Sequence, residues 1–222
     1  MKKILVTLIP LLVILVFLVS WFFGNRHQQL IEAVRDGDFQ EVQELSTQMP
    51  LFILNAYHKH PGMGSKSLYG DTALHISIKN SRVKIMKFLI GKGIDIEALT
   101  ADYRTPLQLA AERGLLEGVE LLLEHGAEFD KSGSASESKT ALFLASENLH
   151  PEVVKRLLTA GADSQAKDYT GQTPKEAAAK RQLLYDENST AVRFGQVRNQ
   201  DEFNDWVAQR RFAVITLLDQ AM

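Results

Sequence analysis

The sequence predicts an all-α solenoid built from helix–turn–helix units and preceded by an N-terminal transmembrane helix. A threonine-centred motif that returns every 33 to 35 residues, and a glycine that returns in step with it, predict the solenoid. An uncharged apolar stretch at residues 4–23 predicts the membrane helix. The 222 residues leave room for about one domain and an appendage.

Residues 1–26 are predicted to be a signal anchor. The apolar stretch is 20 residues long, which suffices to cross a bilayer, and no small-residue cleavage site follows it. Lys2 and Lys3 precede the stretch and Arg26 follows it, so the positive-inside rule favours a cytoplasmic N-terminus. The short lysine-led start resembles bacterial leaders. We therefore expect a single-pass protein of the bacterial inner membrane with a periplasmic soluble part, with cleavage or a cytoplasmic soluble part as the alternatives.

The repeat is marked by two independent features. Thr72, Thr105, Thr140 and Thr173 follow one another at 33, 35 and 33 residues. Gly93, Gly126 and Gly161 each lie 21 residues after one of the first three threonines. Agreement between the two series indicates a true structural repeat.

Local chemistry explains why each unit forms two helices. A threonine followed by proline or alanine is typical of a helix start, because the hydroxyl caps free amides. A second segment carries an apolar stripe at helical spacing, and the glycine then ends that helix in a left-handed conformation. The stripes contain Val83, Met86, Leu89 and Ile90, then Leu116, Val119, Leu122 and Leu123, then Val153, Val154, Leu157 and Leu158.

These motifs resemble the ankyrin repeat, through Thr105-Pro106-Leu107, Gly126-Ala127 and the 33-residue period. The resemblance covers about residues 28 to 182. It implies antiparallel helix pairs linked by β-turn fingers, and a surface that binds another protein. Two finger positions where glycine is usual hold Tyr103 and Ser138. The position of His75 is occupied in later units by Gln108, Phe143 and Glu176.

The predicted boundaries follow from this register. The repeats span 27–182, in the order N-terminal cap 27–48, insert 49–66, repeats 67–99, 100–134 and 135–167, and the start of a last repeat at 168–182. Residues 183–222 are predicted to be a polar excursion and a capping helix. Its apolar stripe contains Phe203, Trp206, Val207, Val214, Leu217 and Leu218.

Composition excludes several functions. The net charge of -2 argues against nucleic acid as a partner, and the absence of cysteine excludes disulfides and thiolate zinc sites. No phosphate loop or nucleophile elbow is present, so we expect no enzyme activity, no cofactor and no small-molecule substrate. His58 and His60 could hold a metal together with His75 or Asp71, but two solvated loop histidines are the simpler interpretation.

The resemblance implies that finger tips and the exposed ends of the first helices bind a partner protein. By position these residues are Tyr69, Asp71, Lys79, Asn80, Asp102, Tyr103, Arg104, Glu112, Arg113, Lys139, Glu147, Asn148 and Tyr169, to which the insert adds Phe52. The three tyrosines could form a hot spot or could cover the backbone of their own fingers. The apolar run at 51–54 either plugs the cap end or presents a patch to a partner or the membrane surface.

A membrane-anchored ankyrin protein is similar in architecture to small bacterial proteins that neutralise a secreted toxin. We therefore expect an immunity protein that occludes the toxin in the periplasm, with the groove or the insert as the covering surface. The alternative is a scaffold that tethers an envelope or cytoplasmic enzyme to the inner membrane without inhibiting it.

Overall fold

A computed structural model of the chain describes residues 25–56, 70–131, 138–181 and 200–221. These residues form two compact units, Met1–Asp95 and Ile96–Met222, and each is described by itself. The predicted membrane segment 4–23 lies outside the described residues. So do His58, His60 and Tyr69, which belong to a second undescribed range. Within the described ranges, no helix is both long and apolar enough to cross a membrane. These ranges form helices and turns without a β-strand, as expected for an all-α solenoid.

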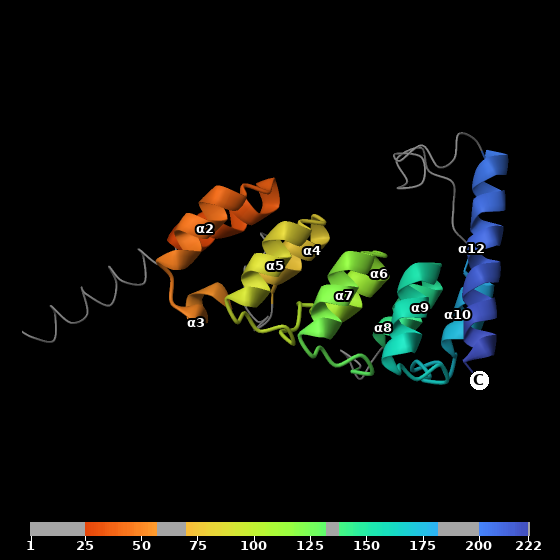
Figure 1. Cartoon of the computed structure of the whole chain (residues 1–222). Helices are drawn as coiled ribbons and strands as arrows, with labels where there is room; N and C mark the ends of the chain where they lie inside the picture. Colours follow the sequence, from red (N-terminus) through yellow and green to blue (C-terminus); the bar gives the residue numbers. More distant parts are fainter. Residues whose placement is uncertain (1–24, 57–69, 132–137, 182–199, 222) are drawn as a thin grey trace, which may run out of the picture. The chain divides into compact units, whose positions relative to one another are not determined.

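The first unit contains helical residues 25–36 and four further helices (Figure 1). These are α2 (Phe39–Thr47), α3 (Leu51–Leu54), α4 (Ala73–Lys79) and α5 (Val83–Gly91). Apolar residues of the cap, among them Leu30, Ile31 and Val34, are completely buried. Phe39 of α2 meets Phe88 of α5 edge to face, with ring centroids 5.6 Å apart, so the cap packs on the second helix of the next repeat.

The second unit stacks helix pairs and ends on a long helix (Figure 1). Its helices are α6 (Pro106–Glu112), α7 (Leu116–Glu124), α8 (Ala141–Glu147), α9 (Pro151–Ala160), α10 (Pro174–Lys180) and α12 (Gln200–Gln220). The first helices α6, α8 and α10 pack side by side, and α7 packs on α9. Helix α12 lies against α9 and α10, where Phe203, Val207, Val214 and Leu218 are buried. Helix α12 thus covers the last helices of the second unit.

Each first helix begins at the predicted threonine. The hydroxyls of Thr72, Thr105, Thr140 and Thr173 accept hydrogen bonds from the amides of His75, Gln108, Phe143 and Glu176. Three of these partners also accept a hydrogen bond from the threonine amide and close a capping box, which a phenylalanine side chain cannot do. Histidine, glutamine and glutamate are thus interchangeable here because each offers an acceptor atom.

Left-handed residues mark the turns. Gly93, Gly126 and Gly161 have φ of 81°, 87° and 99°, which confirms the predicted helix ends. In the fingers, Tyr103 and Ser138 adopt φ of 58° and 48°. The backbone at both positions therefore keeps the left-handed conformation that favours glycine, and the side chains of Tyr103 and Ser138 make this conformation strained.

The insert divides its apolar run between core and surface. Leu54 of α3 is buried, whereas Phe52 is 71% exposed and Leu51 is 46% exposed. The run therefore contributes Leu54 to the core and presents Leu51 and Phe52 as an outward apolar pair.

Candidate functional site: a cavity between α8 and α10

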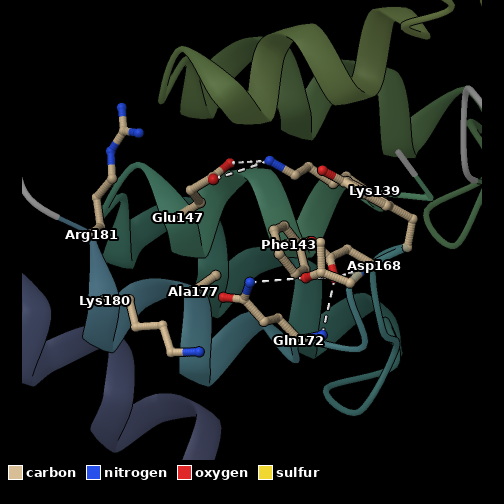
Figure 2. Close-up of a pocket in the computed structure, with 10 residues that line it drawn as sticks. Lys139, Phe143, Glu147, Asp168, Gln172, Ala177, Lys180 and Arg181 are labelled. Atoms are coloured by element: carbon tan, nitrogen blue, oxygen red, sulfur yellow. Dashed lines mark hydrogen bonds and ion pairs between the residues drawn. The ribbon is translucent and has the colours of Figure 1, made fainter. Parts of the chain in front are cut away.

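An open cavity of about 320 Å³ lies beside α8 and α10 in the second unit (Figure 2). Its lining comes from α8, from the end of α10, and from the finger that precedes α10. The lining residues are Lys139, Phe143, Glu147, Asp168, Tyr169, Thr170, Gln172, Ala177, Lys180 and Arg181. Of these, Lys139, Glu147 and Tyr169 belong to the binding surface that the sequence predicts.

An ion pair forms one wall. Lys139 Nζ lies 3.0 and 2.9 Å from the two carboxylate oxygens of Glu147, and Figure 2 shows this pair bridging the cavity edge. Lys139 stands just before the helix and Glu147 ends it, so the pair holds the finger base against the far end of α8. Both side chains keep part of their surface exposed, at 18% and 24%, so each can still contact a partner.

Phe143 gives the cavity an apolar wall. It occupies the third position of α8, where the other repeats place a capping acceptor. The ring is buried, and Lys139 Nζ lies 5.3 Å from its centroid, within the range of a cation–π contact. Phenylalanine at this position therefore cannot accept the hydrogen bond from the threonine amide, and it provides an apolar surface beside a cation instead.

The finger is held by Asp168. One carboxylate oxygen accepts hydrogen bonds from the Thr170 amide at 2.9 Å, the Thr170 hydroxyl at 2.7 Å and the Gln172 amide at 3.0 Å. Desolvation raises the pKa of Asp168, but these hydrogen bonds outweigh it and hold the pKa below its ordinary value. The carboxylate is therefore a turn former, and the turn carries Tyr169 outward with 66% of its surface exposed.

Two cations complete the rim. Lys180 is exposed and Arg181 half-buried at the end of α10, and Figure 2 shows their side chains leaving the helix in different directions. Arg181 reaches the side-chain oxygen of Asn148, another predicted site residue, at 3.5 Å. The lining holds three cations, Lys139, Lys180 and Arg181, against two carboxylates, Glu147 and Asp168, so positive charge is in excess by one.

The other predicted residues lie elsewhere. In the first unit, Lys79 Nζ contacts both carboxylate oxygens of Asp71 at 2.8 Å, and the Asp71 side chain is only 3% exposed. Asn80 caps α4 through the Ile76 carbonyl, and Phe52 lies on α3. Asp102, Tyr103, Arg104, Glu112 and Arg113 lie on or beside α6 and its finger. Tyr69 is outside the described residues.

Sequence reasoning missed Phe143, Ala177, Lys180 and Arg181 as cavity residues. The signal that could have found Phe143 is its place in the register, since an apolar side chain stands where a capping acceptor is needed. The described residues contain no group of three or more histidine or carboxylate side chains that could hold a metal ion. His58 and His60, on which the alternative metal site depends, lie outside those residues.

The repeats match known protein families. A model of three ankyrin repeats matches residues 30–133, and a single ankyrin repeat model matches residues 138–169. The chain belongs to the ankyrin repeat family. Ankyrin repeats imply a module that binds another protein.

Similar ankyrin segments occur in larger proteins of several kinds. The chain is 31% identical over 108 residues to a transient receptor potential cation channel subfamily A member 1 homolog of Caenorhabditis elegans, covering 49% of this chain and 9% of that one. It is 35% identical over 97 residues to a probable E3 ubiquitin-protein ligase of rice, covering 42% and 21%. It is 31% identical over 120 residues to a mouse B-cell lymphoma 3 protein homolog, covering 52% and 27%. The matches thus span about a quarter or less of each relative.

Proposed function

We propose that the chain is a non-enzymatic module that binds another protein through the cavity beside α8 and α10. The carrying observation is that this cavity combines an apolar wall at Phe143, an exposed tyrosine on a hydrogen-bonded finger, and an excess of cations. The exposed tyrosine suits a protein hot spot, and the buried Phe143 ring forms an apolar part of the cavity lining. The rim charges would steer and select the partner.

We further propose that residues 4–23 anchor the chain in a bacterial inner membrane with the repeats in the periplasm. The support is the length of the uncharged run and the lysines before it. A reporter that is active only after export, fused behind Met222, tests the orientation against a cytoplasm-only reporter at the same site. Activity of the export reporter is expected. Activity of the cytoplasmic reporter instead would contradict the periplasmic location.

In this setting the module acts as an immunity protein, covering the active site of a secreted toxin where the toxin arrives. The direct test first looks for a toxin gene beside the gene for this chain, and then measures the survival of cells challenged with that toxin. Cells that carry the chain should survive, and cells that carry Tyr169→Ala with Lys139→Glu should die. If the bound protein keeps its full catalytic activity in the complex, the chain is instead a scaffold that tethers it.

A further inference from the structure

The outward pair on α3 points to a second interaction surface, distinct from the cavity. Phe52 and Leu51 are neighbouring exposed apolar residues, at 71% and 46% exposure. They lie in the insert, which adds about 11 residues to the spacing between the first two units and has no counterpart in the other repeats. Packing of the repeats therefore does not require these two side chains.

The pair is held in a fixed place in the first unit. Leu54 of the same short helix is buried in the core. Directly after α3, the Asn55 side-chain oxygen accepts a hydrogen bond from the Asp95 amide at 2.9 Å. The Ala56 carbonyl accepts one from His27 Nε2 at 3.1 Å. An exposed apolar pair on a held helix is better suited to binding than one on a loose loop.

The contact between His27 and Ala56 limits how far α3 can lie from the end of the apolar run at 4–23. His27 follows Phe23 by four residues, which reach about 14 Å when extended and about 6 Å when helical. Helix α3 is only about 6 Å long. Whatever path the chain takes after Phe23, α3 thus lies within a few nanometres of the end of the run. Arg26 lies in the same stretch and donates to Gln48 at the end of α2.

We propose that Phe52 and Leu51 insert into the headgroup region of the lipid bilayer and orient the first unit on the membrane. The proposal rests on the anchoring proposed above. Aromatic and apolar side chains are favoured at the bilayer interface, where they bury surface that water would otherwise cover. A neighbouring arginine is attracted by anionic headgroups. Phe52, which the sequence assigns to a partner protein, would then face lipid.

The absence of native cysteine allows a clean test. Full-length Phe52→Cys, labelled with an environment-sensitive fluorophore, is reconstituted in vesicles of phosphatidylethanolamine and phosphatidylglycerol, with and without acyl chains that carry bromine. Phe212→Cys is the matched control, because Phe212 is also an exposed phenylalanine, at 74%. Flotation reports separately whether the chain is attached to the vesicles.

We expect the chain to float, and the label at position 52 to shift to shorter wavelength and to lose emission with brominated lipid, while position 212 changes little. A floating chain whose label at 52 behaves as at 212 would overturn the inference and leave the anchoring intact. A chain that does not float would overturn both. A label at 52 that is shielded only when a protein partner is added would assign this pair to the partner and overturn the lipid contact.

Discussion

The repeat formed by α4 and α5 and the repeat formed by α8 and α9 use the same structural devices with different side chains. An ion pair joins the residue before the first helix to the end of that helix in both, but Asp71 and Lys79 exchange signs with Lys139 and Glu147. The acidic partner is almost fully buried in the first repeat, whereas both partners stay partly exposed in the second. The same position is thus structural in one repeat and borders a cavity in the other.

The link to the preceding repeat also differs. In the α4–α5 repeat, Arg82 donates to the carbonyls of Arg35 and Asp36 at 3.2 and 2.8 Å. In the α8–α9 repeat, His150 Nε2 donates to the Glu112 carbonyl at 3.1 Å. Arg82 and His150 both stand directly before the second helix of their repeat, where the α6–α7 repeat has Leu115. The donor at this position is thus a permanent cation in one repeat and a titratable ring in another.

The largest effect is expected from an alanine beside the histidine link. In Gly114→Ala the new Cβ would lie 2.5 Å from His150 Nδ1 at a residue with φ of 69°, and the free energy of unfolding should fall by about 3 kcal/mol. Gly37→Ala is the matched change, because its Cβ would meet Arg82 at 2.6 Å. The arginine end can swing into water, so we expect a loss of about 2 kcal/mol there. Equal losses in urea unfolding would contradict this difference.

The histidine link should make the second unit sensitive to acid. Burial lowers the pKa of His150 from 6.5 to about 4, against the raising effect of its hydrogen bond to Glu112. Between pH 6.5 and 4 the unfolded chain binds more protons than the folded one. The contribution of neutral His150 to the free energy of unfolding is therefore complete above pH 6.5 and is lost as the pH falls toward 4. Allowing for partial exposure, we expect a loss of about 2 kcal/mol.

The control is His150→Gln, in which an amide replaces the ring as donor and does not titrate. Unfolding measured by urea across the same pH range should show a smaller acid loss for this variant. An identical pH profile for the two proteins would show that His150 is not the group responsible.

Next in size is the contrast between the two ion pairs. Asp71→Asn removes the charge from a buried carboxylate and should cost about 1.5 kcal/mol of unfolding free energy. Glu147→Gln acts on a more exposed pair and should cost less than about 1 kcal/mol. Thermal unfolding of the two variants compares the two losses of stability. An equal or larger loss for Glu147→Gln would show that burial does not decide the strength of the pairs.

The smallest expected effect is a gain. Ser81 is exposed and has φ of 54° at the turn between α4 and α5, so Ser81→Gly should relieve strain and add about 1 kcal/mol. Ser81→Ala keeps the strain and serves as the control. Equal unfolding midpoints for the glycine and alanine variants would exclude strain at this turn.

The features that could be predicted from the sequence are those that recur at a fixed spacing. The threonine caps, the glycine ends and the stripe of α12 each leave a periodic signal. The structure contains the caps and the glycine ends, and it buries four residues of the stripe while Trp206 and Leu217 are half-buried. The ion pairs left no such signal, because their partners are eight residues apart and lie on opposite ends of a helix. Leu149 has φ of 57°, although leucine is not a residue type that predicts a left-handed backbone. Only its register with Gly114, 35 residues earlier, could have revealed the turn.

The most direct test of the proposed binding surface is photo-crosslinking in cells, with a photoreactive phenylalanine in place of Tyr169 or, as the control, Phe212. Both side chains are aromatic and exposed, but only Tyr169 borders the cavity. We expect a discrete adduct with another protein from position 169, lost when Lys139→Glu is added, and none from position 212. Adducts from position 212 with none from position 169 would contradict the cavity beside α8 and α10 as the site of protein binding.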